Sequence, residues 1–153
     1  MICFDNAFHG KELMVALSGD PDAPFTVGRW GHCISITRGG KLVGGVVYDN
    51  WWQVSIGMHI CGLEENFITR DFLWAIYHYP FEQLKVDKVF GLVASTNPKA
   101  MNIAEHMGFT PEGKMVGAIK GGDLVIYAMY RADCRWLRIV PKNLKAGAGR
   151  TTS

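Results

Sequence analysis

Alternating apolar and polar positions mark the strands of this chain. Residues 33–48, CISITRGGKLVGGVVY, alternate on both sides of a Gly39-Gly40 turn, which predicts a β-hairpin. In the next run, residues 53–62, the apolar side chains share one face and His59 lies on the other. The nearly continuous apolar run 88–95 is typical of a strand that is covered on both faces.

Two segments, residues 8–17 and 69–84, show the helical spacing of apolar side chains. In the first, the inward side chains are expected to be Leu13, Met14 and Leu17. In the second, Thr69 can cap the first turn by accepting from its free N–H groups. Pro80 interrupts the second pattern, and we expect it to kink or loosen the last turns.

A third helix is marked at both of its ends. Asn97 can cap the first turn, and Pro98 suits the first helical position because its missing N–H is no loss there. Gly108 can adopt the left-handed conformation that ends a helix. The segment between them is long enough for about two and a half turns, so a short and sharply bounded helix is predicted.

Two further strands, residues 115–120 and 123–133, are predicted on either side of a Gly121-Gly122 turn. The order of elements is then helix, hairpin, strand, helix, strand, helix, hairpin. This order predicts an α/β (α+β) domain whose mixed sheet is antiparallel at both ends and parallel in the middle. We expect six or seven strands and three to four helices within residues 1–140, followed by a flexible basic tail, 141–153.

Composition excludes several other classes of protein. The net charge of +2 gives no indication of nucleic-acid binding, and no apolar run approaches the roughly 18–20 residues of a membrane span. The first residues lack the pattern of a signal peptide, so a cytoplasmic protein is expected. No two cysteines have metal-ligand spacing, which favours free buried thiols and no metal at Cys3, Cys33, Cys61 and Cys134.

Several short phrases occur together in an order typical of one superfamily. They are Phe81-Glu82-Gln83-Leu84, Asn97, Gly108-Phe109, Glu112-Gly113 and Tyr127-x-Met129-x-Arg131. With the elements before them, they resemble the GNAT superfamily of acyl-CoA-dependent N-acyltransferases over residues 5–137. Within it, the chain is similar to enzymes that acetylate protein N-termini, ribosomal proteins among them, or antibiotics, and to short phage- or prophage-borne members.

The resemblance implies a transferase that moves an acyl group, acetyl above all, from acyl-CoA to an amine by direct attack. Its two central parallel strands would splay apart and hold the pantetheine arm of acetyl-CoA. The cofactor-binding residues would then be Met58, Ile60, Phe67, Ile68, Thr69, Arg70, Asn97 and Lys99. The acceptor would be a small molecule, a protein or a modified base, and a homodimer is compatible with the family.

Three features that are common in the family are absent from this chain. Residues 64–70 lack the glycines of its phosphate loop, and Ala104 and Ala100 stand where other members carry a Tyr or a Ser that protonates CoA. Substitute catalytic candidates are His59 as base and Tyr127 as acid, with Tyr130 as a second phenol. The alternative is a diverged module that binds a protein or nucleic-acid partner without catalysis.

An aromatic pair, Trp51-Trp52, lies between the hairpin and the central strand. One interpretation is a turn whose rings cover the edge of the core. The other is a wall of the acceptor pocket, which makes Trp51, Trp52 and the nearby His32 candidate substrate-binding residues.

Overall fold

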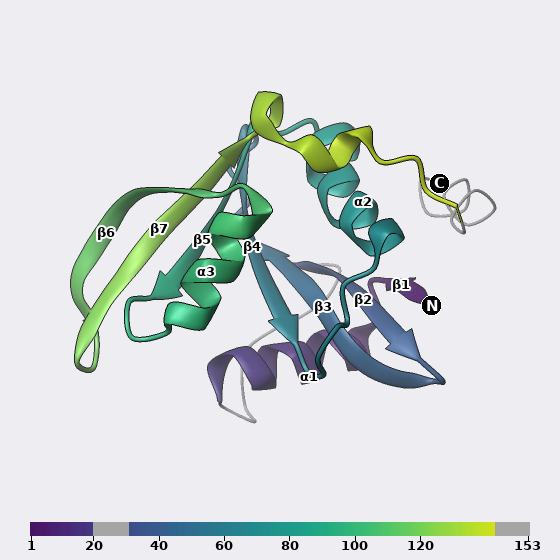
Figure 1. The fold of residues 1–153 in the computed structure, drawn as a ribbon, viewed down its shortest axis with the longest axis horizontal. Helices are drawn as coiled ribbons and strands as arrows, with labels where there is room; N and C mark the ends of the chain where they lie inside the picture. Colours follow the sequence, from purple (N-terminus) through teal and green to yellow (C-terminus); the bar gives the residue numbers. More distant parts are fainter. Residues whose placement is uncertain (20–30, 143–153) are drawn as a thin grey trace.

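A computed structural model describes residues 1–19 and 31–142 of the 153-residue chain (Figure 1). The strands are β1 (Ile2–Phe4), β2 (His32–Arg38), β3 (Lys41–Asp49), β4 (Ser55–Gly62), β5 (Lys88–Ala94), β6 (Thr110–Ile119) and β7 (Gly122–Tyr130). The helices are α1 (Ala7–Ser18), α2 (Arg70–His78) and α3 (Pro98–Met107), with short turns of helix at Tyr79–Gln83, Arg131–Asp133 and Arg135–Arg138. From residue 143 on, the expected tail lies outside the described residues.

The strands form one seven-stranded sheet in the order β1-β2-β3-β4-β5-β7-β6. Every neighbouring pair is antiparallel except β4 and β5, which confirms the mixed sheet with a parallel pair in its middle. Three strand limits differ from expectation. Strand β4 begins at Ser55 because Gln53 has a φ of 69°, β6 begins at Thr110, and β7 ends at Tyr130, where a helical turn follows. The three-residue β1 gave no periodic signal in the sequence.

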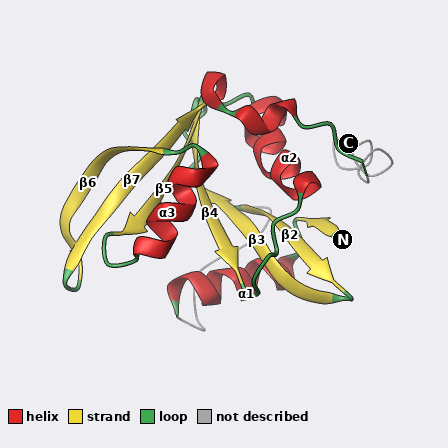
Figure 2. Cartoon of the chain, in the orientation of Figure 1, coloured by secondary structure: helices red, strands yellow, loops and turns green. Residues whose placement is uncertain are grey.

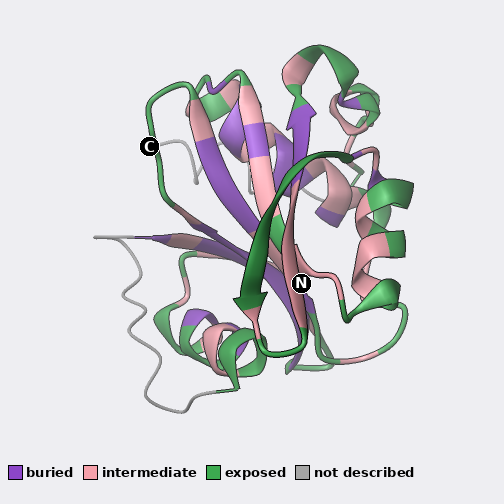
Figure 3. Cartoon of the chain, turned by 90° about the vertical axis from the view of Figure 1, so that its left-hand side faces the viewer, coloured by how far each residue is buried: buried purple, intermediate pink, exposed green. Residues whose placement is uncertain are grey.

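Helix α1 lies on one face of the sheet, and α2 and α3 lie on the other (Figure 2). Two apolar clusters reflect this division. The smaller joins Leu13 of α1 to Val47 and Cys61, and the larger surrounds Phe72 and Ile76 of α2. The far edge of the sheet is different, since β6 is exposed almost along its whole length (Figure 3). In the described part of the chain, no helix is long and apolar enough to span a bilayer.

The parallel strands β4 and β5 pair over only three residues of each strand. The rungs join Ser55 to Lys88, Ile56 to Val89 and Gly57 to Phe90. Beyond them β4 continues to Gly62 and β5 to Ala94 without further pairing between the two strands. The strands therefore diverge toward their carboxyl ends, as the family resemblance implies.

Both ends of α3 are as expected from the sequence. The Asn97 side chain accepts from the N–H of Ala100 at 3.1 Å, and Pro98 occupies the first turn. Gly108 ends the helix with a φ of 104°, a conformation that costs glycine little. The helix start is thereby fixed directly after β5, beside the divergence of the strands.

The helix expected over residues 69–84 is interrupted at its proline. Helix α2 ends at His78 and continues as a π-helical turn, Tyr79–Gln83. Because Pro80 has no N–H, it cannot donate to the Ile76 carbonyl one turn earlier. The buried Tyr48 hydroxyl donates to that carbonyl instead, which ties β3 to the end of α2.

An ion pair joins the two sequence phrases that surround β5. Arg131 Nη2 lies 2.8 Å from Glu82 Oε1, and Arg131 Nη1 donates to the Phe81 carbonyl. The Arg131 N–H also donates to the Asp87 carbonyl at 2.9 Å. The end of β7 is therefore fastened to the turn that leads into β5, at the closed end of the divergence.

Replacing the buried phenol by Tyr48→Phe should lower the free energy of unfolding by about 1–3 kcal/mol, because the Ile76 carbonyl loses its donor. Denaturant unfolding measures this change. The half-exposed Tyr130→Phe is a matched control expected to change stability by at most about 0.5 kcal/mol. Equal effects of the two substitutions would contradict the role given to Tyr48.

Candidate functional site

A cleft of about 1020 Å³ lies where β4 and β5 part. Its walls come from both strands, the segment 63–68, α3, β7 and the last turn of α1. Eight residues singled out in the sequence line it together: Met58, His59, Ile60, Phe67, Ile68, Asn97, Lys99 and Tyr127. Leu17, expected to face the core, lines the cleft instead and is 41% exposed.

Main-chain groups of β4 face into this cleft. The Leu63 N–H donates to the Val43 carbonyl, so every second residue of β4 directs its N–H to β3. The alternate residues Met58 and Ile60 direct theirs to the other side, toward β5. Since the last residue of β4 paired with β5 is Gly57, the peptide groups of Ile60 face the gap between the strands.

The segment after β4 is held by an aromatic ring that fills the space above two glycines. Gly44 and Gly62 are direct partners in the β3–β4 ladder. A Cβ at either position would lie 2.3 Å or 2.4 Å from carbon atoms of the Phe67 ring. The two glycines therefore create the seat for Phe67, a relation across strands that the linear sequence does not reveal.

The charges of this segment are partly balanced. Lys41 Nζ lies 2.5 Å from Glu64 Oε1, and this hydrogen bond lowers the pKa of the Glu64 carboxyl. Arg38 Nη2 donates to the Asn66 carbonyl at 2.8 Å. Both acids that follow β4, Glu64 and Glu65, line the cleft. Lys41 thus offsets one of the two negative charges that follow β4.

The start of α2 offers main-chain donors but lies at the margin of the cleft. Thr69 caps the helix by accepting from the Phe72 N–H at 3.2 Å. Within the described residues, the N–H groups of residues 67–70 donate to no other group. Thr69 and Arg70 are exposed and are not among the residues lining the cleft. Of these four residues, only Phe67 and Ile68 line the cleft.

His59 is the histidine that lines the cleft, and it forms a hydrogen bond with a carboxylate. Its Nε2 lies 2.8 Å from Asp49 Oδ1, and the two side chains are 26% and 35% exposed. His59 lies on the face of β4 that also carries Cys61, which contacts Leu13 of α1. The imidazole therefore lies on the α1 side of the sheet.

Tyr127 reaches the cleft from the opposite face. It belongs to the larger apolar cluster, together with Met58 and Phe109, and is 1% exposed. Burial, and then the nearby Glu105 carboxylate, raise the pKa of its phenol, so the hydroxyl keeps its proton at neutral pH. Tyr127 and His59 therefore line the same cleft from opposite faces of the sheet.

The predicted acceptor residues lie elsewhere. Trp51 and Trp52 are 58% and 70% exposed, so the interpretation that they cover the core edge is wrong. Neither is among the residues lining the cleft, and His32 is absent from that lining as well. The positive φ angles of Asn50 and Gln53 give their loop its sharp shape.

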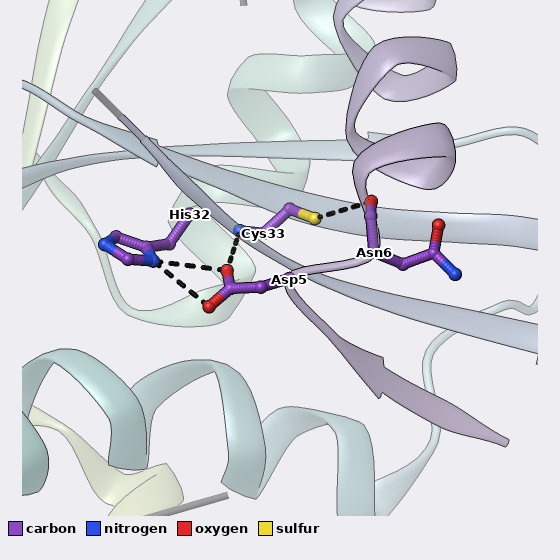
Figure 4. Close-up of polar contacts among 4 residues, drawn as sticks. All are labelled: Asp5, Asn6, His32 and Cys33. Atoms are coloured by element: carbon purple, nitrogen blue, oxygen red, sulfur yellow. Dashed lines mark hydrogen bonds and ion pairs between the residues drawn. The ribbon is translucent and has the colours of Figure 1, made fainter. Parts of the chain in front are cut away.

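His32 belongs to a polar cluster that resembles a catalytic arrangement only in its composition (Figure 4). Its Nδ1 lies 3.1 Å from Asp5 Oδ2, and Asp5 Oδ1 accepts from the Cys33 N–H at 3.1 Å. The Cys33 thiol points to the Asn6 carbonyl, and burial, followed by the charge of Asp5, raises its pKa to about 11. The cluster fastens the end of β1 to β2 and provides no activated thiol.

All four cysteines are free, and three of them are buried. Among residues 1–19 and 31–142, no group of three or more His, Cys, Asp or Glu side chains could hold a metal ion. The side chains that line the cleft include an imidazole, a phenol, the Lys99 amine and the Glu64 and Glu65 carboxylates.

Solved structures provide the comparison with known proteins. A variant of the spermidine N-acetyltransferase SpeG from Vibrio cholerae is 21% identical, with a TM-score of 0.61 over 72% of this chain and 70% of that one. A probable acetyltransferase is 23% identical, with a TM-score of 0.59 over 68% and 63% of the two chains. The chain has a GNAT-like fold. No protein-family model and no curated protein sequence matches it.

The same GNAT-like fold recurs in the SpeG structure with manganese, at 23% identity and a TM-score of 0.58 over 69% of this chain and 68% of that one. At such identities the likeness concerns the fold. The placement of the GNAT-like strands agrees with the expectation drawn from the sequence, while the roles of individual side chains rest on the geometry of the cleft.

The substitution Gly44→Ala adds a Cβ that overlaps the Phe67 ring. It should lower the free energy of unfolding by about 1–3 kcal/mol through overpacking. In a Phe67→Ala background most of this cost should disappear, because the ring is gone. Denaturant unfolding of the four proteins of this cycle measures the coupling. Additive effects would show that Gly44 does not act through Phe67.

Proposed function

We propose that the chain is an acyl-CoA-dependent N-acyltransferase that moves an acetyl group to an amine. The observation that carries this proposal is the divergence of β4 and β5 after Gly57 and Phe90, with a cleft between them. A pantetheine arm is an extended chain with amide groups. The peptide groups of Ile60 at the edge of the gap are suited to hydrogen-bond it.

The anionic end of acyl-CoA would lie toward the segment 63–70. Main-chain N–H groups near a helix start favour phosphate, and those of Phe67 and Ile68 adjoin the cleft. Lys99 lines the cleft, and Arg70 stands at the start of α2, so both can add positive charge. Asn97 uses its side-chain oxygen on the helix, which leaves its amide group to contact the pantetheine.

The reaction would be a direct transfer through the gap. The amine nitrogen attacks the thioester carbonyl from the α1 side, a C–N bond forms, and the C–S bond breaks. His59 takes the proton that the amine loses, and Tyr127 gives its proton to the departing CoA thiolate from the opposite side. The products are an amide and CoA.

The acceptor is the least constrained part of the proposal. The solved structures named spermidine N-acetyltransferase make a polyamine the first acceptor to test. The sequence also resembles enzymes that acetylate the N-termini of ribosomal proteins, and phage-borne members of the superfamily. Peptide α-amines and lysine side chains are therefore the next acceptors to test. The exposed pair Trp51 and Trp52 is proposed to contact the acceptor where it extends beyond the cleft.

A second function, binding without catalysis, is favoured by one observation. The segment 63–68 contains no glycine, and Phe67 fills its seat above Gly44 and Gly62. Residues with a Cβ keep backbone N–H groups farther from a phosphate than glycines do. A module that binds a partner through the same cleft would fit this feature, and it would not bind acetyl-CoA.

Binding of acetyl-CoA separates the two functions. At about one hundred times its Kd, acetyl-CoA should stabilise the protein by about 2.7 kcal/mol, seen as a rise in melting temperature. Gly91→Val places a side chain on the cleft wall and should abolish this rise. Its Cβ would also lie 3.0 Å from the Met58 carbonyl oxygen, so cooperative unfolding of the free variant must be shown first. Gly113→Val is the matched control, because its nearest neighbour to an added Cβ is 3.7 Å away. No rise at millimolar acetyl-CoA would overturn the proposal.

Removing one hydroxyl by Tyr127→Phe should lower kcat about 100-fold or more and leave acetyl-CoA affinity unchanged, because only proton donation to the thiolate is lost. CoA release in the presence of spermidine or a lysine-containing peptide measures the rate. Tyr130→Phe, which removes a half-exposed phenol, serves as control. Unchanged kcat in Tyr127→Phe would exclude this phenol as the acid.

A further inference from the structure

A carboxylate, an imidazole and a glycine on two neighbouring strands form one unit beside the cleft. Asp49 is the last residue of β3 and lies directly opposite Gly57 in the ladder to β4. His59 follows Gly57 by two residues, so the three positions share the α1 face of the sheet. Resting on the proposed acyl transfer, we infer that Asp49 is the positioning residue of His59 and that Gly57 makes this pairing possible.

The contact defines which nitrogen of His59 is free. A neutral imidazole has one N–H and one acceptor nitrogen. With Asp49 Oδ1 at 2.8 Å from Nε2, the proton resides on Nε2 and is donated to the carboxylate. The acceptor lone pair is then on Nδ1. Asp49 therefore holds the imidazole in the tautomer that has Nδ1 available to take a proton.

Gly57 is the steric condition for this arrangement. A Cβ at residue 57 would lie 2.4 Å from Asp49 Oδ1 and 3.0 Å from the Asp49 carbonyl oxygen. The carboxylate occupies the space that any larger residue would fill. Because the carboxylate is the end of a flexible side chain, an added methyl group would displace it and with it the hydrogen bond to His59.

Among the described residues, Asp49 is the charged group that His59 contacts, although Glu65 and Lys99 also line the cleft. The α1 helix contributes only the apolar Leu17 to the described lining of the cleft. The part of β5 in that lining, residues 91–94, contains no charged side chain. The acid Glu64, which also lines the cleft, is paired with Lys41. The hydrogen bond to Asp49 is thus the contact that orients the imidazole in this proposal.

The kinetic test replaces each member of the unit. Asp49→Ala should lower kcat about 10- to 100-fold with the KM for acetyl-CoA within about twofold, since Asp49 acts through His59 and not on the cofactor. Asp49→Asn, which keeps an acceptor oxygen, should retain more activity than Asp49→Ala. Asp133→Ala, at an exposed carboxylate, is the matched control. Spermidine and a lysine-containing peptide are the acceptors used.

Gly57→Ala should reduce kcat in the wild-type background and change it little in Asp49→Ala, because its effect passes through the carboxylate. Nitrogen chemical shifts of the His59 ring supply a readout that does not depend on activity. The wild type should show the proton on Nε2, and Asp49→Ala should show a mixture of tautomers. His106→Gln identifies the signals of the exposed histidine on α3.

Four outcomes separate the inference about Asp49 from the proposed function. If Asp49→Ala transfers acetyl groups as fast as the wild type, this inference is overturned while the proposed function stands. The same holds if the His59 ring of the wild type carries its proton on Nδ1. If the wild type neither binds acetyl-CoA nor transfers an acetyl group, the proposed function is overturned, and this inference with it. A Gly57→Ala loss that persists unchanged in Asp49→Ala shows that Gly57 does not act through the carboxylate.

Discussion

The divergence of two parallel strands is the constraint on which the rest of this structure depends. Main-chain groups in a sheet favour pairing, and leaving them unpaired is costly when they are buried. Here β4 and β5 part although each is paired along its other edge. Strand β4 pairs with β3 from Gly57 to Gly62, and β5 pairs with β7 along its whole length. The gap is therefore built into a rigid frame.

The same divergence places the two candidate catalytic groups in relation to each other. His59 lies on the α1 face and Tyr127 on the face covered by α2 and α3, so the sheet would separate them if it were continuous. A thioester held in the gap would have one group on each side. This geometry suits an attack from one face with departure toward the other.

Local signals in the sequence were sufficient for much of the fold. Asn97 and Gly108 set the ends of α3 through interactions with their own neighbours, and Pro80 interrupted its helix as expected. The order of elements predicted the parallel pair. The short β1 was missed because three residues carry no periodicity.

The site itself was less predictable, because its key relations cross between strands. The seat of Phe67 depends on two glycines that become partners only in the β3–β4 ladder. The pairing of Asp49 with His59 depends on the same ladder and on a glycine between them. The sequence showed His59 as a candidate, but no linear spacing connects it to Asp49. The exposed Trp51 and Trp52 show the reverse case, a conspicuous motif that lies outside the cleft.

Amide hydrogen exchange with and without acetyl-CoA tests the role of the gap most directly. The account predicts slower exchange in peptides that cover residues 58–62 and 91–94, because a bound pantetheine arm would occupy main-chain groups that no strand pairs. The exposed β6 should exchange at the same rate in both conditions. Bound acetyl-CoA that leaves residues 58–62 unprotected, or protects only regions outside the cleft, would contradict the account.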